Sequence, residues 1–128
     1  VTSEAKVTLA IDAMGGDEGP DEILEGLALA VEEAPRSARF VVVGQEDVLG
    51  PMIETKPRLT SANVETHHAS EIIAMGEKPI AGIKQKKDSS MARALEMVKE
   101  NEADALLSCG NTGCLMAGGA IRLRTLDG

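Results

Sequence analysis

The chain has 128 residues and a formal net charge of −8, and 43% of its residues are hydrophobic and 27% charged. This composition is typical of a globular chain, its length suits one domain or part of one, and it argues against a disordered chain. The negative charge would repel a nucleic-acid backbone, and Phe40 is the sole aromatic residue available to stack on bases. We therefore expect no nucleic-acid partner.

The cysteine pattern and the absence of long apolar runs predict a cytoplasmic protein without a metal. Cys109 and Cys114 have no second cysteine pair and no histidine nearby, so their spacing fits neither a zinc site nor a disulfide framework. We expect both to be small, reduced and half-buried. Residues 1–6 lack the basic and apolar regions of a secretory signal, and no run reaches the roughly 18 apolar residues that a membrane span needs.

In the first half of the chain, strand patterns alternate with helix patterns. Residues 7–11 favour a short strand, and Pro20 then begins a helix that Pro35 ends. Residues 40–43 form a continuous apolar run of the kind found in strands buried on both faces. A weak helix is expected over residues 46–54.

The same alternation continues to the end of the sequence. A third strand is expected over residues 63–67, and Ser89 or Ser90 is expected to cap a helix that buries Met91 and Leu95. A fourth strand covers 105–107, and an apolar helix follows from about 114 to 123. This order predicts an α/β fold with three α/β/α layers and a mostly parallel sheet, which looks incomplete with four strands.

Two of the expected strands end in glycine-rich loops. The first strand leads into Met14-Gly15-Gly16-Asp17, and the fourth leads into Gly110-Asn111-Thr112-Gly113. Glycine allows close approach of an anion to backbone N–H groups, and ligands of open α/β sheets bind at the carboxyl ends of the strands. Ordinary tight turns are the alternative for each loop.

A basic segment lies between these loops in the sequence. Residues 78–93 contain five cations and one acid, a local excess of about +4 in a chain of net charge −8. Ser89 and Ser90 follow the lysines, so an anion there would meet charge, hydroxyl groups and backbone donors together. The alternative is a solvated face with a routine helix cap. His67 and His68 could supply a base or an anion donor, although a structural role is the commoner one.

Three separated motifs resemble the PlsX family of phosphate acyltransferases. They are residues 12–17 (DAMGGD), 86–91 (KKDSSM) and 108–116 (SCGNTGCLM), in the order and spacing of that family. His68-Ala69 and Lys78-Pro79 are also similar to it. The sequence departs from the family in having Glu18 where a histidine is frequent, and cysteines at 109 and 114 where alanine is usual.

The resemblance implies transfer of a fatty acyl group from acyl carrier protein to inorganic phosphate, without a cofactor, to give acyl phosphate for phospholipid synthesis. It implies a Rossmann-like fold related to isopropylmalate dehydrogenase, a homodimer, and a cytoplasmic enzyme that associates loosely with the membrane and supplies a membrane acyltransferase. Because family members are much longer, residues 1–128 would be the N-terminal part of a single α/β acyltransferase domain, inactive alone. A non-catalytic module that binds phosphate or carrier protein, and a phosphotransacetylase-like enzyme, are the alternatives.

Together, these observations predict the residues of the site. Asn111, Thr112 and Lys87 are the catalytic candidates, which would hold phosphate or stabilise the developing oxyanion. The candidates for binding phosphate or carrier protein are Gly15, Gly16, Asp17, Lys86, Lys87, Ser89, Ser90, Gly110 and Gly113. His68 and Asp12 are further candidates, and Asp12 and Asp17 are expected to brace the first loop by accepting amide hydrogen bonds. The lysines have a competing role, because acidic carrier proteins could dock on them.

Overall fold

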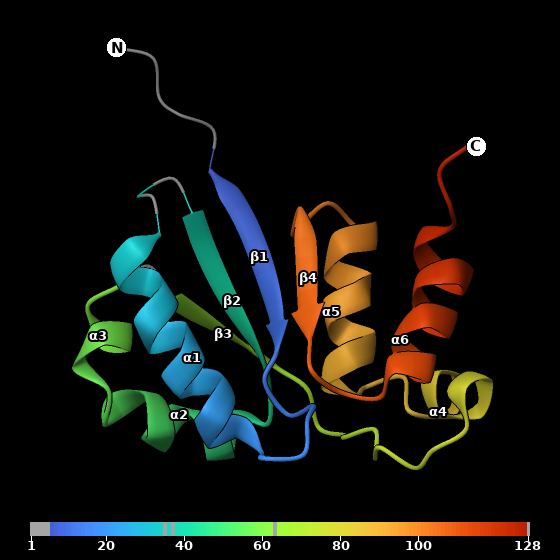
Figure 1. Ribbon diagram of the computed structural model, residues 1–128, viewed down its shortest axis with the longest axis horizontal. Coiled ribbons are helices and arrows are strands. Elements are labelled where there is room, and N and C mark those ends of the chain that lie inside the picture. Colours follow the sequence, from blue (N-terminus) through green and yellow to red (C-terminus); the bar gives the residue numbers. More distant parts are fainter. Residues whose placement is uncertain (1–5, 35, 37, 63, 128) are drawn as a thin grey trace.

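A four-stranded, all-parallel sheet forms the centre of the structure, a computed structural model that describes residues 6–34, 36, 38–62 and 64–127. The strands are β1 (Val7–Asp12), β2 (Ala38–Gly44), β3 (Val64–His68) and β4 (Ala105–Ser108), in the spatial order β3-β2-β1-β4 (Figure 1). The predicted fold class and all four predicted strands are confirmed. The expected helix stop at Pro35 and strand start at Asn63 lie outside the described residues.

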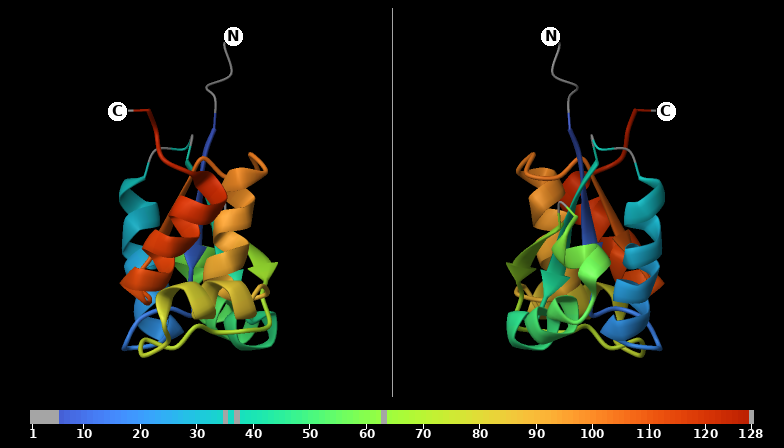
Figure 2. Two further views of the ribbon diagram at one scale, coloured as in Figure 1. Left: turned by 90° about the vertical axis from the view of Figure 1, so that its right-hand side faces the viewer. Right: turned by 90° about the vertical axis from the view of Figure 1, so that its left-hand side faces the viewer.

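Helices cover both faces of this sheet, as the two side views in Figure 2 show. One face carries α1 (Pro20–Glu33), α2 (Glu46–Glu54) and α3 (Pro57–Thr60), and the other carries α5 (Ser90–Lys99). Beyond α5 lie α4 (Pro79–Gln85) and α6 (Thr112–Gly118), which pack together, and α6 runs into a π-helix, η1 (Gly119–Leu123). The helices expected from Pro20, over 46–54 and after the serines are confirmed.

Alternation along the strands explains how the two layers attach. Ile11 and Val42 pack with Leu24 of α1 on one face of the sheet. Ala10 and Val41 pack with Met97 of α5 on the other. Successive strand residues point to opposite faces of the sheet. A strand that is apolar throughout, such as β2, is therefore buried on both faces, as its sequence predicted.

Two short helices, α3 and α4, were not predicted from the sequence. Each begins with a proline, Pro57 or Pro79, at its first position, where the missing N–H costs nothing. They have 4 and 7 residues, too few for a helical period of apolar residues to emerge. Their positions depend on packing against α1, α2 and α6.

One edge of the sheet is only partly covered. Within the described residues β4 pairs with β1 alone, and Leu107 in the middle of β4 is 51% exposed. An apolar hollow of about 360 Å³ lies between this strand and α1 and includes Leu9, Ile23 and Phe40 in its lining. The described chain contains no helix that is both long and apolar enough to cross a membrane.

The core on the α1 face gives a direct test of the packing. Leu24 is fully buried, whereas Leu29 on the same helix is 61% exposed. We expect Leu24→Ala to lower the free energy of unfolding by about 3 kcal/mol, because it removes buried methyl groups and leaves a cavity. Leu29→Ala should change it by less than about 0.5 kcal/mol. Urea denaturation of both variants measures the difference, and equal effects would contradict the placement of α1.

Candidate functional site

The buried carboxylate of Asp12 joins three segments at the carboxyl ends of β1 and β4. Asp12 is 1% exposed, and its Oδ1 accepts the backbone N–H groups of Met14 (3.2 Å) and Gly15 (3.1 Å). The Ser90 hydroxyl donates to the same oxygen (2.5 Å), and the Ser108 hydroxyl donates to Oδ2 (2.7 Å). The first glycine loop, the start of α5 and the end of β4 therefore meet at one side chain, and the prediction that Asp12 braces the first loop is confirmed.

The two glycine loops are in direct contact beside Asp12. A Cβ atom built on Gly15 would lie 2.9 Å from the Gly110 Cα and 2.6 Å from Asp12 Oδ2. Gly16 has a φ of +110°, a conformation that other residues rarely adopt, and it lies against Cys109. The expected meeting of the two loops at the carboxyl edge of the sheet is therefore present.

Several amides of these loops point inward, which differs from the anion cradle that the sequence suggests. Gly15 N–H donates to Asp12, and Gly110 N–H donates to the Ser108 hydroxyl (3.1 Å). Within residues 6–34 and 64–127, the N–H groups of Gly16, Thr112 and Gly113 have no hydrogen-bond acceptor. Of these three residues Thr112 is exposed, and Gly16 and Gly113 are partly exposed.

Ser89 and Ser90 are both buried, at 0% and 2% exposure. The Ser89 hydroxyl accepts the Ala92 N–H (3.1 Å), so the expected N-cap of α5 is confirmed at Ser89. The Ser90 hydroxyl is occupied by Asp12. In this arrangement both side chains hold protein groups together, and their contact with phosphate stays a prediction.

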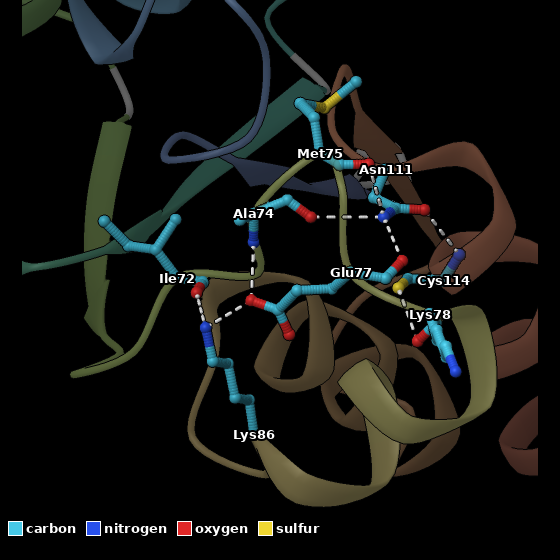
Figure 3. A network of polar contacts seen from close by, with 8 residues as sticks. All are labelled: Ile72, Ala74, Met75, Glu77, Lys78, Lys86, Asn111 and Cys114. Atoms are coloured by element: carbon cyan, nitrogen blue, oxygen red, sulfur yellow. Dashed lines mark hydrogen bonds and ion pairs between the residues drawn. The ribbon is translucent and has the colours of Figure 1, made fainter.

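Asn111 is a clamp between α6 and the loop that precedes α4 (Figure 3). Its Oδ1 accepts the Cys114 N–H (3.0 Å) and caps α6. Its Nδ2 donates to the carbonyls of Ala74 (3.1 Å), Met75 (2.9 Å) and Glu77 (2.9 Å). The side-chain amide has two N–H bonds, and both are engaged, so Asn111 has no free donor for an oxyanion in this conformation.

Lys86 holds the same loop from its other side (Figure 3). Its ammonium forms an ion pair with Glu77 and donates to the Ile72 carbonyl (2.7 Å). Glu77 also accepts the Ala74 N–H (2.9 Å), and the Lys86 ammonium, followed by that N–H, lowers the pKa of Glu77. Lys86 is therefore partly committed to the fold, and its contact with phosphate stays a prediction.

Lys87 lies apart from these groups. It is exposed and lines a hollow on the outer side of α5 with Arg93, Glu96 and Arg122. Arg93 pairs with Asp88 (2.5 Å) and Arg122 with Glu96 (2.8 Å), so Lys87 is the member of this group without an ion pair among the described residues. The structure does not bring Lys87 together with Asn111 and Thr112, its predicted catalytic companions.

The remaining candidates occupy different settings. His68 ends β3, and its Nδ1 accepts the Glu46 N–H (3.2 Å) at the start of α2. That bond occupies Nδ1 and leaves Nε2 of the ring as the atom available to a ligand. Asp17 is exposed, and within the described chain its side chain accepts no hydrogen bond, so the expected bracing by Asp17 is wrong.

The two cysteines are both free, but neither is half-buried as expected. Cys109 is exposed, whereas Cys114 is fully buried. Burial raises the pKa of the Cys114 thiol.

Asp88 is a second carboxylate that sequence analysis did not assign. Ser70 donates its hydroxyl and its N–H (3.0 Å) to Asp88 Oδ2, and Arg93 donates to Oδ1. The Ser70 hydrogen bonds, followed by Arg93, lower the pKa of Asp88 to about 2.

Sequence analysis also did not assign Ser108 and Glu77. The signal for Ser108 was its place inside the third motif, whereas nothing in the sequence links Glu77 to Lys86.

Comparison with known proteins shows the family of this chain. A family model described as "Fatty acid synthesis protein" matches residues 7–128. The chain belongs to this family. The resemblance of its three motifs to the PlsX phosphate acyltransferases is thereby confirmed.

Curated relatives in this family are much longer than the chain. A phosphate acyltransferase of Methylococcus capsulatus is 43% identical over 121 residues, which cover 94% of this chain and 35% of the relative. Phosphate acyltransferases of Lysinibacillus sphaericus and Cereibacter sphaeroides are 41% and 40% identical, covering 94% and 99% of this chain and 34% of each relative. The chain thus spans about a third of the length of these relatives.

The Asn111 clamp can be separated into its two functions. We expect Asn111→Ala to lower the free energy of unfolding by about 2 kcal/mol, because it removes a helix cap and leaves three carbonyls without their donor. Asn111→Ser retains a capping oxygen and should lose less. Denaturant unfolding measures both variants, and an Asn111→Ala variant as stable as the original would contradict the clamp.

The low pKa of Asp88 predicts a pH dependence of stability. Because this pKa is about 2 in the folded chain and 3.8 for an unperturbed aspartate, the ionised form stabilises the fold above about pH 4. The contribution should disappear as the pH falls from about 4 to about 2. Urea unfolding of the original chain and Asp88→Asn, from pH 6 to pH 2, should show a stability difference that shrinks over that interval. A constant difference would show that Asp88 is not held in this way.

Proposed function

We propose that this chain forms the phosphate-holding part of a phosphate acyltransferase, which transfers a fatty acyl group from acyl carrier protein to inorganic phosphate. The observation that carries the proposal is the convergence of the two glycine loops at the carboxyl edge of the sheet, in a chain of the fatty acid synthesis protein family. The name of its relatives, phosphate acyltransferase, describes this class of reaction.

The proposed reaction needs no nucleophilic side chain, because phosphate itself is the nucleophile. A phosphate oxygen attacks the thioester carbonyl, the C–O bond forms as the C–S bond breaks, and the carrier thiol leaves with the proton. Catalysis can therefore come from holding phosphate in line with the carbonyl and from donors to the developing oxyanion. We assign the phosphate to the N–H groups of Gly16, Thr112 and Gly113, because these have no acceptor within the described chain.

The outer position of Lys87 supports a different task for that residue. In the hollow shared by Lys87, Arg93 and Arg122, both arginines have carboxylate partners, and Lys87 is left as the unpaired cation among the described residues. An acidic carrier protein would be attracted to such a surface. The family resemblance also supports a cytoplasmic homodimer whose product passes to a membrane acyltransferase, with the longer protein loosely at the membrane.

A chimera tests the proposed function. Because the relatives are about three times longer, we expect the 128 residues alone to be inactive. In the chimera, these residues replace the matched segment of the Methylococcus capsulatus relative. The chimera should form acyl phosphate from acylated carrier protein and inorganic phosphate, and hydroxylamine trapping of the acyl phosphate measures this product. Transfer to coenzyme A instead would favour a phosphotransacetylase-like enzyme. Phosphate binding without turnover would favour a non-catalytic module.

The same chimera tests Lys87. Replacement by Ala should raise the KM for acyl carrier protein roughly threefold to tenfold and leave the KM for phosphate unchanged, since an exposed charge acts mainly on the encounter. Lys99→Ala, at the far end of α5, is a matched control that should change neither constant. A rise in the KM for phosphate alone would assign Lys87 to phosphate, as the sequence suggested.

A further inference from the structure

We propose that Asp12 is the positioning residue of the phosphate site, and that it sets the place of the second glycine loop through the Ser108 hydroxyl. The inference rests on the proposed function, because it concerns how the same site is held in shape. Asp12 does not touch the ligand in this proposal. It acts through the backbone of Gly15 and Gly110.

Two consecutive hydrogen bonds connect Asp12 to the second loop. The Ser108 hydroxyl donates to Asp12 Oδ2 (2.7 Å), so its proton is directed inward. A lone pair of the same oxygen is then available to the Gly110 N–H, which lies 3.1 Å away. Each bond in such a chain polarises the next, so a carboxylate makes Ser108 a better acceptor for Gly110 than a lone serine would be.

The other carboxylate oxygen fixes the first loop. Asp12 Oδ1 accepts the N–H groups of Met14 and Gly15, which places the Gly15 Cα against Gly110 with no room for a side chain between them. The separation of the two loops is therefore determined by the two oxygens of one side chain. A shift of either loop would move Gly16 or the 110–113 turn, which carry the N–H groups proposed to hold phosphate.

The chemistry of the surrounding groups requires a carboxylate. Within the described residues no lysine, arginine or histidine pairs with Asp12, and its partners are two N–H and two O–H donors. A buried charge without a counter-ion is tolerated when several donors satisfy it. An asparagine in its place would offer an NH₂ group to at least one of these donors, and that contact would be lost.

The decisive experiment compares two serine substitutions in the chimera described above, by calorimetric titration with inorganic phosphate. Ser108→Ala removes the link between Asp12 and Gly110. Ser70→Ala is a matched control, because its hydroxyl also donates to a carboxylate, that of Asp88, but lies outside both loops. We expect Ser108→Ala to weaken phosphate binding roughly tenfold and Ser70→Ala to leave the affinity unchanged.

Asp12→Asn provides the second measurement. In a variant that unfolds cooperatively, it should weaken phosphate binding at least as much as Ser108→Ala, and the double variant should add little, because both act through one chain of bonds. Should Asp12→Asn not fold, the serine pair still decides. Equal phosphate affinities for Ser108→Ala, Ser70→Ala and the unsubstituted chimera would overturn the positioning role. Absence of phosphate binding by the unsubstituted chimera would overturn the proposed function as well.

Discussion

A buried carboxylate without a counter-ion is the constraint on which the carboxyl edge of this sheet depends. Removing a charge from water costs more free energy than any single contact returns, so Asp12 is stable only while several donors satisfy it. Those donors come from the loop after β1, from the start of α5 and from the end of β4. Segments far apart in the sequence are thereby held at one point, which gives the loops a shape before any ligand arrives.

This constraint explains the composition of the motifs. Asp12 accepts amides two and three residues further along the chain, the local turn that aspartate favours, and Ser108 accepts the amide two residues after it in the same way. Glycine is required at position 15 because a Cβ atom would collide with both Asp12 and Gly110. Much of what looks like an anion-binding sequence therefore serves to join two loops, and only part of it is left to meet a ligand.

Prediction from sequence succeeded where a signal is local. The apolar run of β2, the proline at the start of α1 and the serine cap of α5 each depend on a few adjacent residues, and all are present in the structure. Prediction was weaker where the partner is distant. The donors of Asn111 bind carbonyls 34 to 37 residues away, and Lys86 is drawn to Glu77 by the fold of the intervening helix. A hydroxyl or an amide in a motif is visible in the sequence, but whether it faces a ligand or another loop depends on the tertiary arrangement.

The ion pairs of the basic segment, residues 78–93, likewise could not be predicted from the sequence, because they depend on the tertiary arrangement. Of the five cations in residues 78–93, Lys86 is paired with Glu77 and Arg93 with Asp88, so the local excess of positive charge is smaller than its sequence indicates. Asp12 adds a negative charge beneath the glycine loops. These ion pairs and the charge of Asp12 reduce the attraction of this part of the chain for phosphate. If the loops bind it, they must do so through N–H groups held in a fixed geometry, and a group that sets that geometry then matters more than a nearby cation.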